Sequence, residues 1–286
     1  MIDGFDWRGI SARVFGAAAV LAASLTVSAF DAATTSARAC GVETDCKIGD
    51  RWYRIRMPSG HDGTSKVGAI FFMHGWRGSP VGVMGNRKLA KAIDDLGVAL
   101  VAPKSLNVDW DIPNSPRPGS NVELAFFDRL IDDVSKRFAI DRKRLLATGF
   151  SAGGMMVWNL ICHRSQSFQA FVPLAGTFWR PVPDACDTPP ANVVHVHGTT
   201  DKMVPLTGRP IGNRAHQGDV FKALALYRRH GAFGEATEVS DRDLTCDRAR
   251  NGAGLILSFC RHSGGHWYRP HHITRVWRLM EKQGAL

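Results

Sequence analysis

After Cys46 the chain alternates between short apolar runs and longer segments of helical periodicity, and this alternation constrains its fold more than any other feature. The pattern is typical of βαβ units, in which parallel strands are joined by crossover helices. We therefore expect the α/β class, with a mostly parallel central sheet and helices on both of its faces. The expected strands are 51–57, 68–73, 98–102, 144–149, 170–174, 193–196 and 255–260, and the expected helices are 124–138, 153–162, 220–229 and 273–282.

Two local patterns refine this picture. The segment 51–57 alternates between polar and apolar residues, as an edge strand does. Ser120 and Glu123 have the spacing of a capping box, and apolar residues follow on one helical face from Leu124 to Phe138. The Pro/Asn-rich stretch 107–120 before this helix is predicted to be a long loop, and such loops often carry function.

Length and composition favour one soluble domain. The 286 residues, of which 44% are hydrophobic and 22% charged, exclude collagen-like, disordered and coiled-coil classes. Since no repeat, low-complexity tract or hydrophilic linker divides the sequence, we expect a single domain over 40–286. The net charge of +10 is scattered in short basic tracts without interleaved aromatic residues, so we expect no nucleic-acid partner.

The N-terminus indicates export. An uncharged apolar run, 15–29, follows Arg8 and Arg13, and it is shorter than a membrane-spanning helix. We expect residues 1–29 to be a signal peptide, cleaved after Ala29 or, as a second choice, after Ala39. The alternative is an uncleaved amphipathic start, because Asp3 makes the leader less basic than usual. Cleavage predicts a secreted or periplasmic protein without a stable membrane anchor.

Cysteine usage agrees with export. All six cysteines lie after the leader, and an even number in an exported chain predicts disulfides, for which fifteen pairings are possible. A zinc site typically has closely spaced thiols, as in C-x-x-C, and no two cysteines here are that close. We therefore expect no metal. The cysteines are Cys40, Cys46, Cys162, Cys186, Cys246 and Cys260.

The sequence GFSAG at 149–153 matches G-x-S-x-G, in which the glycines allow a tight turn that exposes the serine hydroxyl. The match alone is weak, but here it follows an apolar strand and opens a predicted helix, as this turn requires. Ser151 is therefore the candidate nucleophile.

A serine hydroxyl needs a base to take its proton and a carboxylate to orient that base, in the chain order Ser, Asp, His. Asp201 follows a buried strand, where catalytic groups gather, whereas Asp184 and Asp187 lie in a Pro-rich connection and Asp219 begins a helix. Asp201 is therefore the candidate acid. The strand histidines before it, His195 and His197, are expected to pack behind the site.

His266 lies in a glycine-rich loop after the last predicted strand, which can direct its imidazole at the serine. The rivals are His262, at the strand end, and the pair His271 and His272, which precedes the last helix. His266 is therefore the candidate base.

An oxyanion formed at the serine needs backbone donors, one after the nucleophile and one from the loop after an earlier strand. These donors are the N–H groups of Ala152 and Trp76, with Gly75 as the neighbouring alternative. Indole rings are plausible walls for an apolar acyl group, with surface packing as the alternative role. The candidates are Trp110, Trp179 and Trp267.

Four motifs together resemble the exported esterase family of polyhydroxybutyrate depolymerases, feruloyl esterases and acetylxylan esterases, in the α/β-hydrolase superfamily. The motifs are HG at 74–75, GFSAGG at 149–154, HGTTD at 197–201 followed by VP at 204–205, and GGHW at 264–267. The resemblance runs from about Cys40 to the C-terminus. Many members have a cysteine directly after the HG pair, where this chain has Trp76, which implies a reshaped oxyanion loop and acyl pocket.

The resemblance implies the α/β-hydrolase fold and ester hydrolysis without a cofactor. The substrate would be a polyester oligomer, a feruloylated or acetylated saccharide, or a small ester. A serine peptidase on the same fold and a non-catalytic binding protein are the alternatives. Together with the short separations, the resemblance favours the pairs Cys40–Cys46, Cys162–Cys186 and Cys246–Cys260, the last of which is expected to steady the loop that carries His266.

Overall fold

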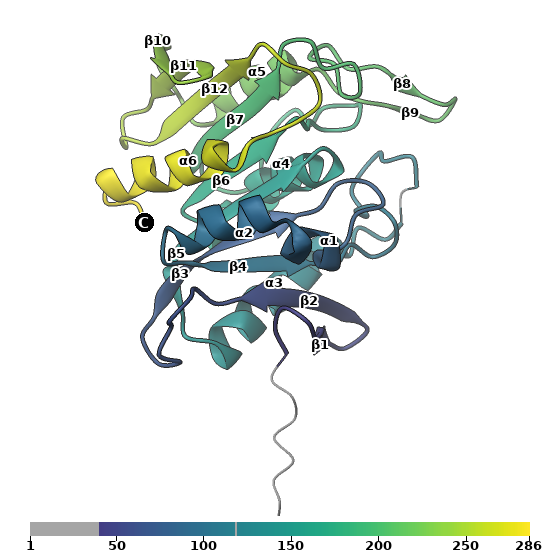
Figure 1. The fold of residues 1–286 in the computed structure, drawn as a ribbon. Helices are drawn as coiled ribbons and strands as arrows, with labels where there is room; N and C mark the ends of the chain where they lie inside the picture. Colours follow the sequence, from purple (N-terminus) through teal and green to yellow (C-terminus); the bar gives the residue numbers. More distant parts are fainter. Residues whose placement is uncertain (1–39, 118) are drawn as a thin grey trace, which may run out of the picture. The chain divides into compact units, whose positions relative to one another are not determined.

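The computed structural model describes residues 40–117 and 119–286, and Figure 1 shows the ribbon of this part. The signal peptide predicted at 1–29 lies outside the described residues. None of the helices within 40–117 and 119–286 is long and apolar enough to cross a membrane.

A ten-stranded sheet forms the centre, in the order β1-β2-β4-β3-β5-β6-β7-β12-β11-β10. The six strands from β4 to β12 in this order are parallel, and the two at each end pair antiparallel. The bounds are β1 Cys46–Ile48, β2 Arg51–Arg56, β3 Val67–Met73, β4 Ala99–Pro103, β5 Ile140–Phe150, β6 Ala170–Leu174, β7 Asn192–Gly198, β10 Thr237–Asp241, β11 Leu244–Arg250 and β12 Ile256–His262, with a separate pair β8 Pro210–Ile211 and β9 Ala215–His216.

Helices cover both faces of the sheet because neighbouring strand residues point to opposite sides. Phe71 and Met73 of β3 pack in one buried cluster with α3, α4 and α5, whereas Ile70 and Phe72 pack in another with α1, α2 and α6. The helices are α1 Pro80–Gly85, α2 Arg87–Asp94, α3 Glu123–Arg137, α4 Ala152–His163, η1 Ser165–Ser167, α5 Val220–His230 and α6 Pro270–Lys282.

Two of the local predictions are wrong. The segment predicted as an edge strand, β2, is the second strand, because the short β1 pairs outside it. The predicted capping box at 120–123 does not form: α3 has no side-chain cap, and Glu123 is fully buried and accepts a hydrogen bond from Arg51 Nη2 at 2.6 Å. A buried carboxylate needs a cationic partner more than the helix end needs a cap.

We expect Arg51→Met to lower the free energy of unfolding by about 3–5 kcal/mol, because it leaves the carboxylate of Glu123 buried without its cation. Glu123 also accepts from the Leu106 N–H at 2.9 Å and the Asp111 N–H at 3.2 Å, so the loop before α3 loosens as well. Urea denaturation measures the loss. In the matched control, Lys91→Met breaks an exposed pair with Asp95 and is expected to cost much less. Equal losses in both variants contradict the prediction.

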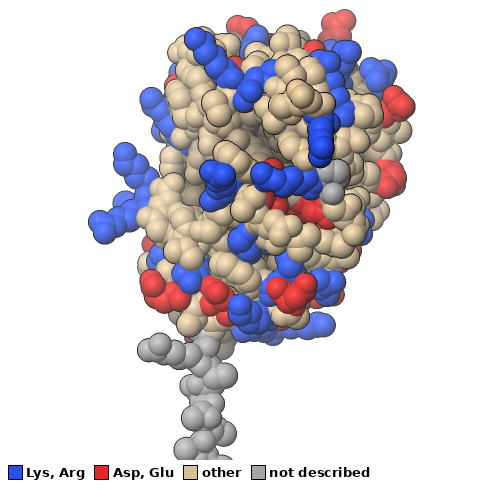
Figure 2. Space-filling model, turned by 90° about the vertical axis from the view of Figure 1, so that its right-hand side faces the viewer, with Lys and Arg blue, Asp and Glu red and all other residues tan. Residues whose placement is uncertain are grey.

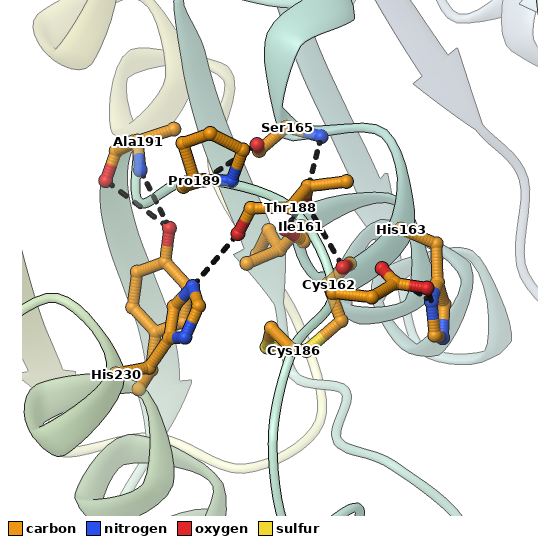
Figure 3. The surroundings of a disulfide bond; sticks show 11 residues. Ile161, Cys162, His163, Ser165, Cys186, Thr188, Pro189, Ala191 and His230 are labelled. Atoms are coloured by element: carbon orange, nitrogen blue, oxygen red, sulfur yellow. Dashed lines mark hydrogen bonds and ion pairs between the residues drawn. A yellow bond between two sulfur atoms is a disulfide. The ribbon is translucent and has the colours of Figure 1, made fainter.

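The cysteines form three disulfides: Cys40–Cys46 with S–S 2.07 Å, Cys162–Cys186 with 1.93 Å, and Cys246–Cys260 with 2.03 Å. These are the pairs that the family resemblance favours. In Figure 3 the second disulfide joins the end of α4 to the connection that leads to β7. Thr188 of that connection donates from Oγ1 to the Cys162 carbonyl at 3.0 Å and accepts from His230 Nε2 at 2.8 Å (Figure 3). The end of α4 away from Ser151 is therefore anchored.

Candidate active site

Ser151 lies at the sharp turn between β5 and α4, as the G-x-S-x-G pattern predicts. Its backbone has φ 58° and ψ −119°, a strained conformation for a residue with a side chain. The turn is possible because Gly153 passes close to β3: a Cβ there would lie 2.0 Å from the Met73 carbonyl oxygen. This close approach of α4 to the sheet presents the serine hydroxyl at the carboxyl end of the strands.

Asp201 follows β7, and its carboxylate faces four donors. The backbone N–H groups of Met203 and Val204 donate to Oδ1 at 2.8 and 2.9 Å. On the other oxygen, Oδ2, His266 Nδ1 lies at 2.7 Å and His197 Nε2 at 3.3 Å. Both carboxylate oxygens are therefore fixed in position.

This environment keeps Asp201 ionised. Burial acts to raise the pKa of its carboxyl, but hydrogen bonds from His197, His266 and the Val204 N–H outweigh burial and hold the pKa well below its usual range. An ionised carboxylate that accepts from His266 Nδ1 leaves the opposite ring nitrogen, Nε2, unprotonated and able to act as a base.

The loop of His266 is held against the loop of Asp201. Thr199 and Thr200 donate backbone N–H groups to the carbonyls of His262 and Gly264 at 2.9 and 3.1 Å. Gly198 permits this contact, since a Cβ there would lie 2.2 Å from the Gly265 carbonyl oxygen. The imidazole of His266 packs on Phe150, the residue before Ser151, with ring centroids 4.6 Å apart. The candidate acid and the candidate base are hydrogen-bonded, and the imidazole of His266 lies beside the serine turn.

Behind Asp201, three fully buried rings form one hydrogen-bonded row. Trp158 Nε1 lies 3.2 Å from His195 Nδ1, His195 Nε2 lies 2.9 Å from His197 Nδ1, and His197 Nε2 lies 2.8 Å from the Val204 carbonyl oxygen. Because an indole nitrogen only donates, His195 Nδ1 must accept, so the proton of His195 is on Nε2. By the same reasoning His197 carries its proton on Nε2, where it faces the Asp201 carboxylate. The strand histidines pack behind the site, as the sequence indicated.

We expect NMR to find both His195 and His197 as Nε2–H tautomers, with His195 still neutral at pH 6.5, the ordinary pKa of histidine. Burial, and after it the neighbouring His197, lower the pKa of His195 well below its ordinary value. Long-range 1H–15N spectra of protein with labelled histidines identify tautomer and charge. The control, Trp158→Phe, removes the indole donor and is expected to give His195 a mixture of tautomers. An imidazolium signal for His195 at this pH contradicts the arrangement.

Ser151 opens into a cavity of about 210 Å3. The cavity lies on the side of the molecule that carries β8 and β9, and this side faces the viewer in Figure 2. Lys and Arg side chains surround a hollow on this face. The lining is mostly apolar but includes Asp109, Arg209 and Gln217; the apolar members are Trp76, Pro116, Ala152, Met155, Trp179, Met203, Val204 and Ile211.

The predicted oxyanion donors Ala152 and Trp76 both line this cavity with Ser151. Ala152 is the first residue of α4, so its N–H has no acceptor within the helix and carries the positive end of the helix dipole. The Trp76 ring is 52% exposed and stacks with Arg77, whose guanidinium lies 4.4 Å from the ring centroid. Of the predicted wall residues, Trp179 lines the cavity.

Trp110 was predicted to form a wall of the substrate pocket, and this prediction is wrong. Trp110 is 1% exposed, does not line the cavity, and donates from Nε1 to the carbonyl of His74 at 2.8 Å. His74 Nε2 accepts from the Ser105 N–H at 3.3 Å, so its Nδ1 carries the proton that it donates to the Gly75 carbonyl at 2.8 Å. Burial lowers the pKa of His74 to about 4 and so keeps the ring neutral. Trp110 and His74 thus support the loop that carries the predicted oxyanion donor Trp76.

The prediction that Trp267 forms a wall of the substrate pocket is also wrong. The Trp267 ring stacks on His262 at a centroid distance of 3.8 Å and covers Gly264, where a Cβ would lie 2.3 Å from the indole. It does not line the cavity. Trp267 therefore packs the loop of His266 in place, because a large aromatic ring next to a glycine fills the space left by the missing side chain.

Among the described residues, one group of side chains could offer three metal ligands: Asp243, His271 and His272. Sequence reasoning did not connect them because Asp243 is distant in the chain. His272 Nδ1 accepts from the Arg269 N–H at 3.2 Å, so its Nε2 carries the proton that faces Asp243 Oδ2 at 3.2 Å. Arg269 Nη1 lies 3.7 Å from the same oxygen. These side chains are hydrogen-bonded to one another at the start of α6. A cation bound there would have to replace these hydrogen bonds.

Comparison with known proteins adds independent information. A model of the prolyl oligopeptidase family matches residues 127–180. A probable feruloyl esterase C of Aspergillus terreus is 26% identical over 269 residues, which span 88% of this chain and 93% of that protein. Feruloyl esterase C of Emericella nidulans is 31% identical over 170 residues, 57% of this chain and 59% of that protein.

Solved structures are similar along most of the chain. An acetyl xylan esterase from Aspergillus awamori has a TM-score of 0.57 at 13% identity and covers 83% of this chain and 95% of its own. The feruloyl esterase module from Clostridium thermocellum has a TM-score of 0.52 at 14% identity and covers 80% of each chain. At these identities the likeness concerns the fold.

Proposed function

We propose that this chain, which has the α/β-hydrolase fold and is similar to feruloyl esterases in sequence, is a carboxylesterase with a serine nucleophile. The observation that carries the proposal is the 2.7 Å contact between Asp201 Oδ2 and His266 Nδ1, beside a strained turn that presents Ser151 to a cavity. Ser151, His266 and Asp201 are the proposed catalytic triad.

In this mechanism Ser151 Oγ attacks the ester carbonyl while His266 Nε2 accepts its proton. The oxygen that becomes negative accepts hydrogen bonds from the backbone N–H groups of Ala152 and Trp76. His266 then returns the proton to the leaving alcohol, and a water molecule cleaves the acyl-enzyme by the same steps in reverse order. Asp201 holds the imidazole in its working tautomer throughout, without itself taking a proton.

The substrate class that we propose is an ester of an aromatic acid. The relatives from Aspergillus and Emericella are named feruloyl esterases, and the cavity next to Ser151 is lined largely by apolar groups with the indole of Trp179 among them. A flat ring gains both from burial and from stacking on such a wall. A panel of methyl ferulate, acetylated xylan, hydroxybutyrate oligomers and p-nitrophenyl esters tests the class. Faster turnover of acetyl or hydroxybutyrate esters than of methyl ferulate would refute it.

We expect Trp179→Leu to raise KM for methyl ferulate about 3- to 10-fold with little change in kcat, because the aromatic wall is lost equally from the bound substrate and the transition state. KM for p-nitrophenyl acetate is expected to change less than about twofold. Steady-state kinetics on both esters provide the measurement. Trp52→Leu, on β2 and outside the cavity lining, is the control. The same KM increase for both esters would show that Trp179 does not contact the acyl group.

A serine peptidase is the second candidate, because the prolyl oligopeptidase model matches the segment that contains the serine turn. Both enzymes would use the same triad, so only the bond cleaved separates them. Hydrolysis of a p-nitroanilide faster than of the p-nitrophenyl ester with the same acyl group would favour the peptidase.

Export belongs to the same proposal. We propose that 1–29 is removed as a signal peptide, that 40–286 is the single catalytic domain, and that the enzyme acts outside the cytoplasm. The three disulfides support this, since such bonds persist in oxidising compartments. N-terminal sequencing of the protein from the medium or periplasm tests the cleavage.

A further inference from the structure

A second cavity, of about 380 Å3, lies between α6 and the strands β7, β11 and β12. None of its lining residues lines the cavity at Ser151. We call it the α6 cavity. Figure 1 shows the antiparallel strands β10 and β11 at one edge of the sheet and α6 in front of strands nearer its middle.

The polar lining of the α6 cavity is strongly cationic. Five basic residues line it against a single carboxylate, that of Asp241, and Arg275 forms an ion pair with this carboxylate and donates to the Asp241 carbonyl at 2.8 Å. Within 40–117 and 119–286, no carboxylate lies within 4.0 Å of the other four cationic groups. These are Arg242, Arg248, Arg278 and Lys282.

Arg248 is the member that most needs an acceptor. Leu244, Cys246 and Arg248 lie at every second position of β11, so their side chains point to the same face of the sheet. This is the face that α6 covers. The Nε of Arg248 is buried and has no hydrogen-bond partner in the described part of the chain. Burial and the charges of Arg250 and Arg275 lower the pKa of this guanidinium. Arg248 as a whole is only partly buried, but its buried Nε–H lacks an acceptor, which is unfavourable, and a bound anion would supply one.

Apart from His272, the rest of the cavity wall is apolar. It consists of the side chains of Val194, Val196, Leu244, Val276 and Leu279 and the disulfide between Cys246 and Cys260. An inorganic anion would leave this wall without a partner, whereas a ligand with a hydrocarbon body would bury it.

We propose that the α6 cavity binds an organic anion, whose carboxylate is held by Arg248 and the neighbouring guanidiniums and whose apolar body packs against the valines, leucines and the disulfide. Guanidinium suits this role because its planar fork matches a carboxylate with two parallel hydrogen bonds.

Three probes separate the parts of the ligand: octanoate has both the anionic head and the apolar body, octanol has only the body, and sulfate has only the charge. Isothermal titration of the full chain is expected to show octanoate binding at least about 10-fold more tightly than either of the others. Amide chemical shifts locate the site, and we expect changes in 244–248 and 275–282. Sulfate or octanol binding as tightly as octanoate overturns the proposal, as do shift changes confined to residues around Ser151.

Variants give the second test. Arg248→Met is expected to weaken octanoate binding by about 10- to 100-fold, and Arg248→Lys, which keeps the charge, by less. Arg129→Met removes an arginine from α3, outside the cavity lining, and is expected to bind octanoate as the unaltered protein does. Circular dichroism establishes that each variant is folded. Unchanged binding to folded Arg248→Met, or an equal loss in Arg129→Met, refutes the proposal.

Discussion

Replacing Ser151 by alanine is expected to lower kcat for ester hydrolysis by about 10^5- to 10^6-fold. The acyl-enzyme can no longer form, although the oxyanion donors and the cavity remain to bind substrate. The free energy of unfolding is expected to change by less than about 0.5 kcal/mol, because alanine adopts the same strained backbone and the site loses only a hydroxyl. Steady-state assays with p-nitrophenyl esters measure kcat, and urea denaturation measures the free energy of unfolding.

The expected loss belongs to the triad as a unit. Ser151→Ala combined with His266→Ala is therefore expected to be no slower than either single variant, since the base has no function without its nucleophile. Ser167→Ala, in the short helix η1, is the matched control and leaves kcat unchanged. If Ser151→Ala keeps more than a few percent of the activity, Ser151 is not the nucleophile.

Asp201→Asn is the second large effect, and we expect kcat to fall by about 10^4-fold near neutral pH. An asparagine amide can present its NH2 to His266, which then places the imidazole proton on Nε2 and leaves no base facing Ser151. The Met203 and Val204 N–H groups still have a carbonyl oxygen to donate to, so the loop is expected to keep its fold. KM is expected to change little, because Asp201 does not touch substrate.

The structure offers a close control for this variant. Asp243 also accepts from histidine, with His271 Nε2 at 2.7 Å, but it pairs with the first turn of α6 and does not line the serine cavity. Asp243→Asn is therefore expected to leave kcat unchanged and to reduce stability. A large fall in kcat for Asp243→Asn, or a small one for Asp201→Asn, contradicts the assignment of the acid.

The stability effect of Asp243→Asn has an expected pH dependence. Burial acts to raise the pKa of Asp243, but hydrogen bonds from His271 and His272 hold it well below its usual range. A carboxyl whose pKa is lower in the folded than in the unfolded state stabilises above its unfolded pKa and loses this contribution as the pH falls. The difference in unfolding free energy between the unaltered protein and Asp243→Asn should therefore shrink toward acid pH.

Local sequence patterns were sufficient to predict secondary structure where a single segment contains the whole pattern. The strand before Ser151 and the helix after it follow from an apolar run, two glycines and a helical period within 20 residues. Asp201 and His266 could be selected because parallel strands end at one edge of the sheet, so the loops after β7 and β12 had to meet. The catalytic candidates therefore did not require knowledge of the packing.

Elements without a strong local signal were missed. The strand β10 is exposed along its whole length, so it shows no alternation of buried and exposed residues, and it forms only because β11 pairs with it. The helices α1 and α2 have only 6 and 8 residues, so neither is long enough to show a helical period over several turns. Such elements depend on partners that the chain supplies from elsewhere.

By itself, the sequence determined the mostly parallel sheet, the serine turn, and the loops that carry the candidate acid and base, because each follows from hydrophobic periodicity or a local motif. Only the tertiary structure decided which polar groups meet. Glu123 pairs with Arg51 across 72 positions of the chain, Trp110 supports His74, and Trp158 sets the proton positions behind Asp201. The physical reason is that a buried polar group takes the partner that lies nearest in space, and this partner is chosen by the packing of strands and helices rather than by distance along the chain.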